Sequence, residues 1–148
     1  MSERLEMAKE ELKRADHLIY VSLKYTRTVD VIKNVILRLI STVEYGIDAL
    51  FEELKSRKKI QAPTTPIEKC DLLKQIYSDD KELKNYLDFY LLLRKINQAE
   101  VKREREYRRH VTMVANLGTD MMNVDIDLIY KYFEKTKSFI DYVTEKAD

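Results

Sequence analysis

The stretch VDVIKNVILRLISTVEYGIDALFEEL, residues 29–54, decides the fold class of this chain. Its apolar residues recur every three or four positions, the spacing that gathers side chains on one face of an α-helix. This face comprises Ile32, Val35, Ile36, Leu39, Val43, Ile47, Leu50 and Leu54. The pattern predicts a helix over residues 29–56, capped by Thr28 or Asp30. Gly46 interrupts it at a cost of about 1 kcal/mol relative to alanine, which close approach of a neighbouring helix would explain.

The segments on either side of this helix show the same periodicity. Residues 5–19 form a similar stripe, and residues 57–65 separate the long helix from the next one. Thr65-Pro66-Ile67-Glu68 has the residues of a helix start, with Thr as N-cap, Pro at the first position and Glu three residues after the cap. Asp79-Asp80-Lys81-Glu82 repeats this signal, and Asn123 is expected to cap a final helix. The sequence therefore predicts an all-α fold, a five- to six-helix antiparallel bundle forming a single domain over residues 1–148.

Residues 97–117 leave two interpretations open. Asn97-Gln98-Ala99-Glu100 resembles a capping box, which would end one helix and begin another. Alternatively, one helix continues to Leu117, and Gly118 ends it in either case. We favour a kink or short break near Asn97. Tyr107, Val111 and Val114 form a core-facing stripe if this segment is helical, which leaves open that the cations beside them only solvate the outer face of the helix.

Composition excludes several classes of function. One Cys among 148 residues removes a disulfide framework and predicts a reducing, cytoplasmic compartment. No apolar run approaches the roughly 20 residues of a membrane span, so no membrane association is expected. Asn123-x-Asp125-x-Asp127 resembles a calcium loop, but Leu128 occupies the position that requires Gly. Two His without clustered Cys predict no metal site, and we expect no cofactor.

The one local excess of charge is Lys102-Arg103-Glu104-Arg105-Glu106-Tyr107-Arg108-Arg109-His110, with five cations against two carboxylates. Guanidinium groups suit phosphate because they offer paired donors in a plane. Like charge around His110 disfavours the protonated imidazole, which leaves the ring able to accept a proton. Such a base beside a cation is the minimum needed for RNA cleavage without metal. The candidate nucleic-acid-binding residues are Lys102, Arg103, Arg105, Arg108 and Arg109.

The same segment resembles the HEPN family, the helical domains named for higher eukaryotes and prokaryotes nucleotide-binding. Arg105 and His110 give the family's Arg-x4-6-His motif with four intervening residues, and Arg103 and His110 give it with six. In that family, Arg and His of two subunits meet across a dimer cleft and form a metal-independent ribonuclease site. The resemblance, over about residues 30–146, implies a homodimer that binds RNA, with His110 as general base and Arg105 or Arg103 on the phosphate.

Two alternatives remain open. If Arg94 is the family's arginine, the histidine position falls near Glu100 and the site is degenerate. The chain could also be a non-catalytic interaction module whose helical stripes pair with a second copy or a protein partner, which the near-neutral balance of 27 basic and 26 acidic side chains slightly favours. The tyrosines, such as Tyr86 and Tyr90, are interpreted as core-edge rings and not as a platform for bases.

Overall fold

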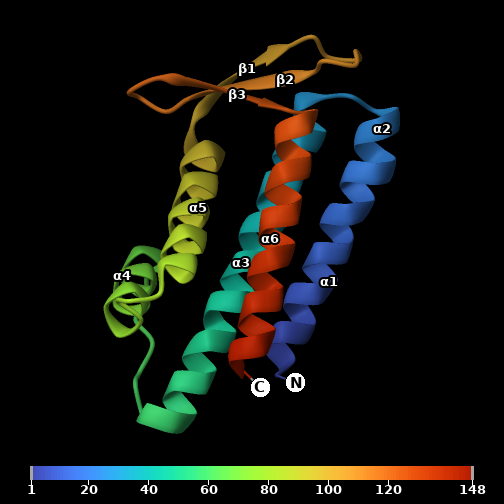
Figure 1. Ribbon diagram of the computed structural model, residues 1–148. Helices are drawn as coiled ribbons and strands as arrows, with labels where there is room; N and C mark the ends of the chain where they lie inside the picture. Colours follow the sequence, from blue (N-terminus) through green and yellow to red (C-terminus); the bar gives the residue numbers. More distant parts are fainter. Residues whose placement is uncertain (1, 148) are drawn as a thin grey trace.

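The computed structural model describes residues 2–147 as a helical bundle with a small sheet across one end. The sheet lies at the end of the bundle opposite the two termini (Figure 1). The helices over residues 3–17 and 81–98 run antiparallel to the long helix over residues 29–58 (Figure 1), but the last helix, residues 126–147, runs parallel to it, so the predicted antiparallel bundle is confirmed only in part. The elements in chain order are α1 (Glu3–His17), the π-helical turn η1 (Leu18–Ser22), α2 (Leu23–Tyr25), α3 (Val29–Lys58), α4 (Pro66–Ile76), α5 (Lys81–Gln98), β1 (Glu100–Glu104), β2 (Thr112–Asn116), β3 (Met121–Asp125) and α6 (Ile126–Ala147).

Helix α3 is the centre of the bundle, and it packs against α1, α5 and α6. All eight apolar residues that define its predicted face are buried. Gly46 lies where α3 and α6 approach closely: a Cβ atom there would sit 2.7 Å from the Phe139 ring and 3.1 Å from the Ile140 side chain. The explanation of Gly46 by a neighbouring helix is therefore confirmed.

The predicted helix starts at Thr28 and Thr65 are confirmed, and the third lies one residue later than the capping-box spacing predicts, at Asp80 instead of Asp79. The side chains of Thr28, Thr65 and Asp80 accept hydrogen bonds from backbone N–H groups in the first turns of α3, α4 and α5. In α4, the Thr65 hydroxyl also donates to the Glu68 carboxylate at 2.8 Å. The connection between α3 and α4 covers residues 59–65, within the expected linker. These starts depend on local side-chain chemistry, which is why the sequence alone identifies them.

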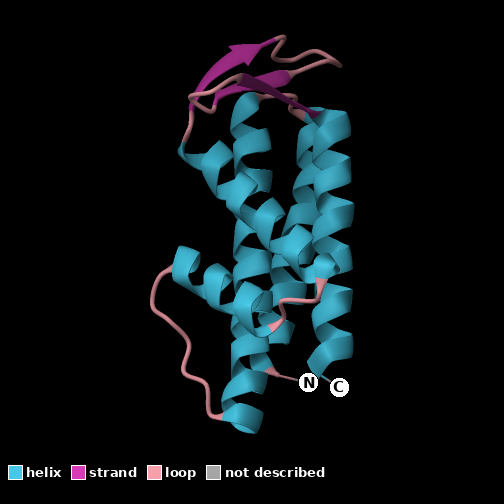
Figure 2. Ribbon diagram, turned by 60° about the vertical axis from the view of Figure 1, so that its left-hand side comes forward, coloured by secondary structure: helices cyan, strands magenta, loops and turns pink. Residues whose placement is uncertain are grey.

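The prediction of a purely all-α fold is wrong for residues 100–125. These residues form a 3-stranded antiparallel sheet in the order β1-β2-β3, which Figure 2 shows covering the ends of the helices. The predicted break near Asn97 is confirmed, because α5 ends at Gln98. Neither of the two expected helices follows it: no new helix begins within residues 99–117, and α5 does not continue to Leu117. Asn123 lies inside β3, and Asp125 caps α6 instead by accepting a hydrogen bond from Leu128 N at 2.9 Å.

Burial by the bundle explains why this segment forms strands. Met113 and Ala115 alternate along β2 and are at most 1% exposed, as is Val124 on β3. The strand β1 carries good helix formers, but its pairing with β2 satisfies the backbone groups and the hydrophobic core extends under the sheet. The expected core stripe is wrong at Tyr107, which is 78% exposed in the β1–β2 connection.

Candidate nucleic-acid interface

The connection between β1 and β2, residues 105–111, is fixed to the start of α3. Arg105 and Tyr107 adopt left-handed backbone conformations, with φ of 55° and 64°, which side-chain-bearing residues adopt only at a cost. Two bonds offset that cost. Tyr107 N donates to Arg27 O at 2.6 Å, and Val29 N donates to Glu106 Oε2 at 3.0 Å. Glu106 thus supplies a capping carboxylate to a helix that begins 77 residues earlier.

Arg103 is part of the same attachment. Its guanidinium pairs with Asp30 at 2.8 Å and with Glu106 at 3.4 Å. The hydrogen bond and charge of Arg103 hold the pKa of Asp30 below its ordinary value, and Asp30 in turn raises the pKa of Arg103. Arg103 faces Met113 across the strands, on the side of the sheet that meets the helices. Its role in the structure is to hold the sheet on α3.

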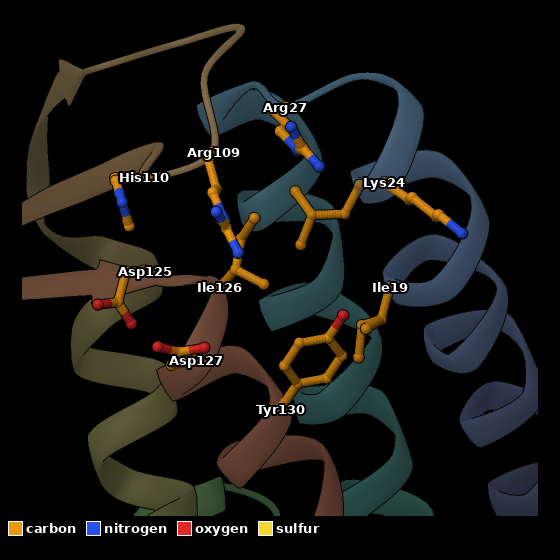
Figure 3. A pocket seen from close by; sticks show the side chains of 10 residues that line it. Ile19, Lys24, Arg27, Arg109, His110, Asp125, Ile126, Asp127 and Tyr130 are labelled. Atoms are coloured by element: carbon orange, nitrogen blue, oxygen red, sulfur yellow. The ribbon is translucent and has the colours of Figure 1, made fainter.

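A cavity of about 430 Å³ lies beside this connection, between the end of α1–α2 and the start of α6. His110 and Arg109 enter it from the β1–β2 connection (Figure 3). We call it the basic cavity. Its lining residues are Ile19, Leu23, Lys24, Arg27, Arg109, His110, Asp125, Ile126, Asp127 and Tyr130.

The positively charged side chains of the basic cavity differ in their interactions with other residues of the protein. The Nε of Arg27 is buried and has no hydrogen-bond partner among the described residues. The Lys24 ammonium lies 5.9 Å from the Tyr25 ring centroid and points away from the other labelled side chains (Figure 3). Arg27 and Arg109 are therefore the guanidinium groups that the cavity offers to an anion.

Two carboxylates stand on the opposite wall, at the start of α6. Figure 3 shows the His110 ring pointing toward Asp125, with Asp127 below. One oxygen of Asp125 is used to cap α6. Both carboxylates lie near the start of α6, at the positive end of its dipole. The cavity thus combines a side that carries guanidinium groups with a side that carries carboxylates.

The predicted site residues fall into two groups. His110 and Arg109 line the basic cavity, whereas Arg103, Arg105, Arg108 and Lys102 do not. Lys102 pairs in register with Val114, on the outer face of the sheet.

Sequence analysis missed Lys24, Arg27 and Tyr130, which come from segments remote from the basic run. The one signal near them is the loss of helical phase around Thr26-Arg27-Thr28, where α2 ends.

The structure gives little support for a cysteine nucleophile, a metal site or a membrane-spanning helix. Cys70 is fully buried, and burial raises the pKa of its thiol from 9.0 to about 11, which opposes a role as a nucleophile. No three His, Cys, Asp or Glu side chains in residues 2–147 are grouped so that they could hold a metal ion. None of the helices described combines the length and apolarity needed to cross a bilayer.

No protein-family model, curated protein or solved structure matches this chain. The resemblance to the HEPN family stays a prediction. The Arg-x4-6-His motif that carries it lies on a β-hairpin in the structure, with Arg103 on β1 and His110 in the connection to β2.

Proposed function

We propose that this protein binds the phosphate backbone of single-stranded RNA at the basic cavity. The observation that carries the proposal is the shared position of two guanidinium groups, Arg27 and Arg109, with His110 in one cavity. The buried, unpartnered Nε of Arg27 supports it. A buried donor without an acceptor is costly, and a phosphate oxygen would supply that acceptor.

The electrostatics of the molecule fit a local site. The chain has a formal net charge of only +1, so long-range attraction of a polyanion is weak. Affinity must then come from a small number of direct phosphate contacts. Each such contact releases counterions, so binding should weaken with salt, with a modest slope that reflects few contacts.

His110 gives the cavity the group needed for RNA cleavage. In the proposed step, the imidazole takes the proton of a ribose 2′-hydroxyl, and the 2′-oxygen attacks the adjacent phosphorus. The bond from phosphorus to the 5′-oxygen breaks, the leaving oxygen takes a proton from water, and a 2′,3′-cyclic phosphate remains. Arg109 and Arg27 would stabilise the charge on the phosphate oxygens. They replace Arg103 and Arg105 in this role, because Arg103 is paired with Asp30.

Binding is tested with Arg109→Ala and Arg108→Ala. Both variants remove one positive charge from the same connection, but only Arg109 lines the basic cavity. In retention assays on labelled single-stranded RNA, we expect Arg109→Ala to weaken binding roughly tenfold, as for loss of a charged hydrogen bond, and Arg108→Ala to have a smaller effect. Equal losses would indicate a diffuse charge effect and no cavity site. Absence of RNA retention by the wild-type protein would favour the interaction module.

Cleavage is tested separately in EDTA, with wild-type protein and His110→Ala. We expect the wild type to cut RNA and to leave the matched deoxyribose strand intact, because that strand lacks the attacking hydroxyl. Cleavage by His110→Ala at the wild-type rate would remove His110 from the mechanism. The homodimer implied by the family resemblance stays a prediction, which light scattering on the purified protein tests.

A further inference from the structure

The basic cavity has an apolar side that phosphate binding does not explain. Ile19, Leu23 and Ile126 line it together with the ring of Tyr130. Phosphate groups gain nothing from contact with such side chains, whereas the flat face of a nucleobase does. A cavity of about 430 Å³ lies within the range that holds small organic ligands.

Tyr130 is placed to support a base. It is 37% exposed, and its ring lies 5.4 Å from that of Tyr20, tilted by 36°. Tyr20 is itself 48% exposed and also contacts Phe133. The interpretation of tyrosines as core-edge rings is wrong for Tyr90, which is fully buried and donates to Glu44, but it fits this partly exposed pair, whose rings keep an accessible side. Stacking of one base on such a ring contributes about 1–3 kcal/mol.

Asp127 stands beside Tyr130 on the same side of α6. A spacing of three residues places side chains on adjacent turns of one helix face. Figure 3 shows the two side chains together at the lower part of the cavity. The Asp127 carboxylate makes no hydrogen bond or ion pair with any other residue in the range 2–147. An ionised carboxylate only accepts hydrogen bonds, so it selects a ligand edge that carries donors.

We propose that the apolar side of the basic cavity holds one unstacked guanine of the bound RNA. The base stacks on Tyr130, and the Asp127 carboxylate accepts hydrogen bonds from its Watson–Crick edge. Guanine presents two adjacent N–H donors there, on N1 and N2, which match the two oxygens of a carboxylate. Adenine and cytosine present one amino group beside an acceptor, and uracil presents one N–H between two carbonyl groups. This inference rests on the proposed RNA binding and adds base selection to it.

The test compares two short RNAs by fluorescence anisotropy at one fixed salt concentration: an all-uridine strand and the same strand with one central guanosine. We expect the wild type to bind the guanosine strand roughly tenfold more tightly, as for one bidentate base contact. Asp127→Asn should abolish this preference, so that the ratio of the two affinities falls to about one, because the amide presents a donor to the N–H groups of guanine. Asp141→Asn, at an exposed position of the same helix, is the matched control and should keep the preference.

A second pair of variants tests the stacking ring. Tyr130→Leu should weaken binding of the guanosine strand by fivefold or more, roughly the lower limit for loss of one stacked base, and Tyr130→Phe should bind as the wild type does. Tyr25→Leu is the control, since Tyr25 is 78% exposed and lies outside the cavity lining. Equal losses for Tyr130→Leu and Tyr25→Leu would overturn stacking at Tyr130.

The remaining outcomes separate this inference from the function on which it rests. Tight binding of both strands without a preference would overturn the guanine site and leave backbone binding in place. A preference that survives Asp127→Asn would overturn the role of Asp127. Failure of the wild type to bind either strand would overturn the proposed function itself.

Discussion

The helical body, formed by α1, α3, α5 and α6, and the sheet cap, formed by residues 100–125, are held in place by different forces. In the helical body, buried apolar side chains such as Leu39 and Phe139 carry the packing. In the sheet cap, only the inner face packs on the hydrophobic core, and the β1–β2 connection is attached to α3 by hydrogen bonds and ion pairs of Glu106 and Arg103. The body therefore sets the overall stability, and the cap sets the shape of the basic cavity.

The largest effect is expected in the centre of the helical body. Phe139 is fully buried, and its ring centroid lies 5.2 Å from that of Tyr86. Phe139→Ala should lower the free energy of unfolding by about 3–5 kcal/mol, through lost burial and a residual cavity. Denaturant unfolding followed by circular dichroism measures it. Lys137→Ala, at an exposed site of the same helix, should change it by less than about 0.5 kcal/mol. A loss below about 1 kcal/mol for Phe139→Ala would contradict the assignment of stability to the body.

Gly46→Ala tests the close approach of α3 and α6 by the sign of its effect. In an exposed helix interior this substitution stabilises by about 1 kcal/mol. Here the added Cβ would lie 2.7 Å from the Phe139 ring, so we expect destabilisation by about 1–2 kcal/mol. The double variant Gly46→Ala, Phe139→Leu should lose less than the sum of the single changes, because the smaller side chain leaves room. A stabilised Gly46→Ala protein would show that the helices can separate at no cost.

Glu106→Ala tests the attachment of the sheet cap. It removes the acceptor for Val29 N and one partner of Arg103, and should cost about 1–2 kcal/mol, as for a lost helix cap. Hydrogen exchange should speed up locally at the amides of Val29 and Tyr107 and remain slow in the middle of α3. The control is Glu104→Ala at the exposed end of β1. Equal protection of these two amides in Glu106→Ala and wild type would contradict this attachment.

The smallest effect concerns a polar contact within the helical body. Burial tends to raise the pKa of Asp80, but hydrogen bonds from Tyr142 and Leu83 N and the charge of Lys146 outweigh it, and the pKa lies below the ordinary 3.8. Ionised Asp80 therefore stabilises the fold above about pH 4, and this contribution is lost as the pH falls through the folded-state pKa. Asn remains a good cap, so Asp80→Asn should mainly flatten the loss of stability in acid, by less than about 1 kcal/mol because Asp80 is partly exposed. Acid titration of unfolding measures it, and Asp79→Asn should titrate as the wild type does.

The accuracy of sequence-based prediction follows the same division between body and cap. The eight apolar residues of α3 and the cap Thr65 were predictable because each depends on side chains within a few positions. The segment from Glu100 to His110 was not, because its charged residues favour a helix when considered alone. Its partner strand β2 is close in the chain, but the burial of β2 against the helices and the attachment of Glu106 to α3 join residues that are far apart.

The candidate site was predictable only in part, for a related reason. His110 and Arg109 belong to the one visible run of charge, and both line the basic cavity. Arg27, Asp127 and Tyr130 join them only because α6 starts beside the end of α2. Arg103 belongs to the same run, but the fold places it against Asp30.

The amino-acid sequence by itself determined the long helices, their caps and the need for a close contact at Gly46. Periodicity, capping and glycine placement are local properties, and they act on any chain that carries them. The tertiary structure decided that residues 100–125 are strands and that His110 shares a cavity with Arg27. Burial of the sheet on the helices and formation of the cavity depend on contacts between distant residues, whose energies exist only once the helical body has brought those residues together.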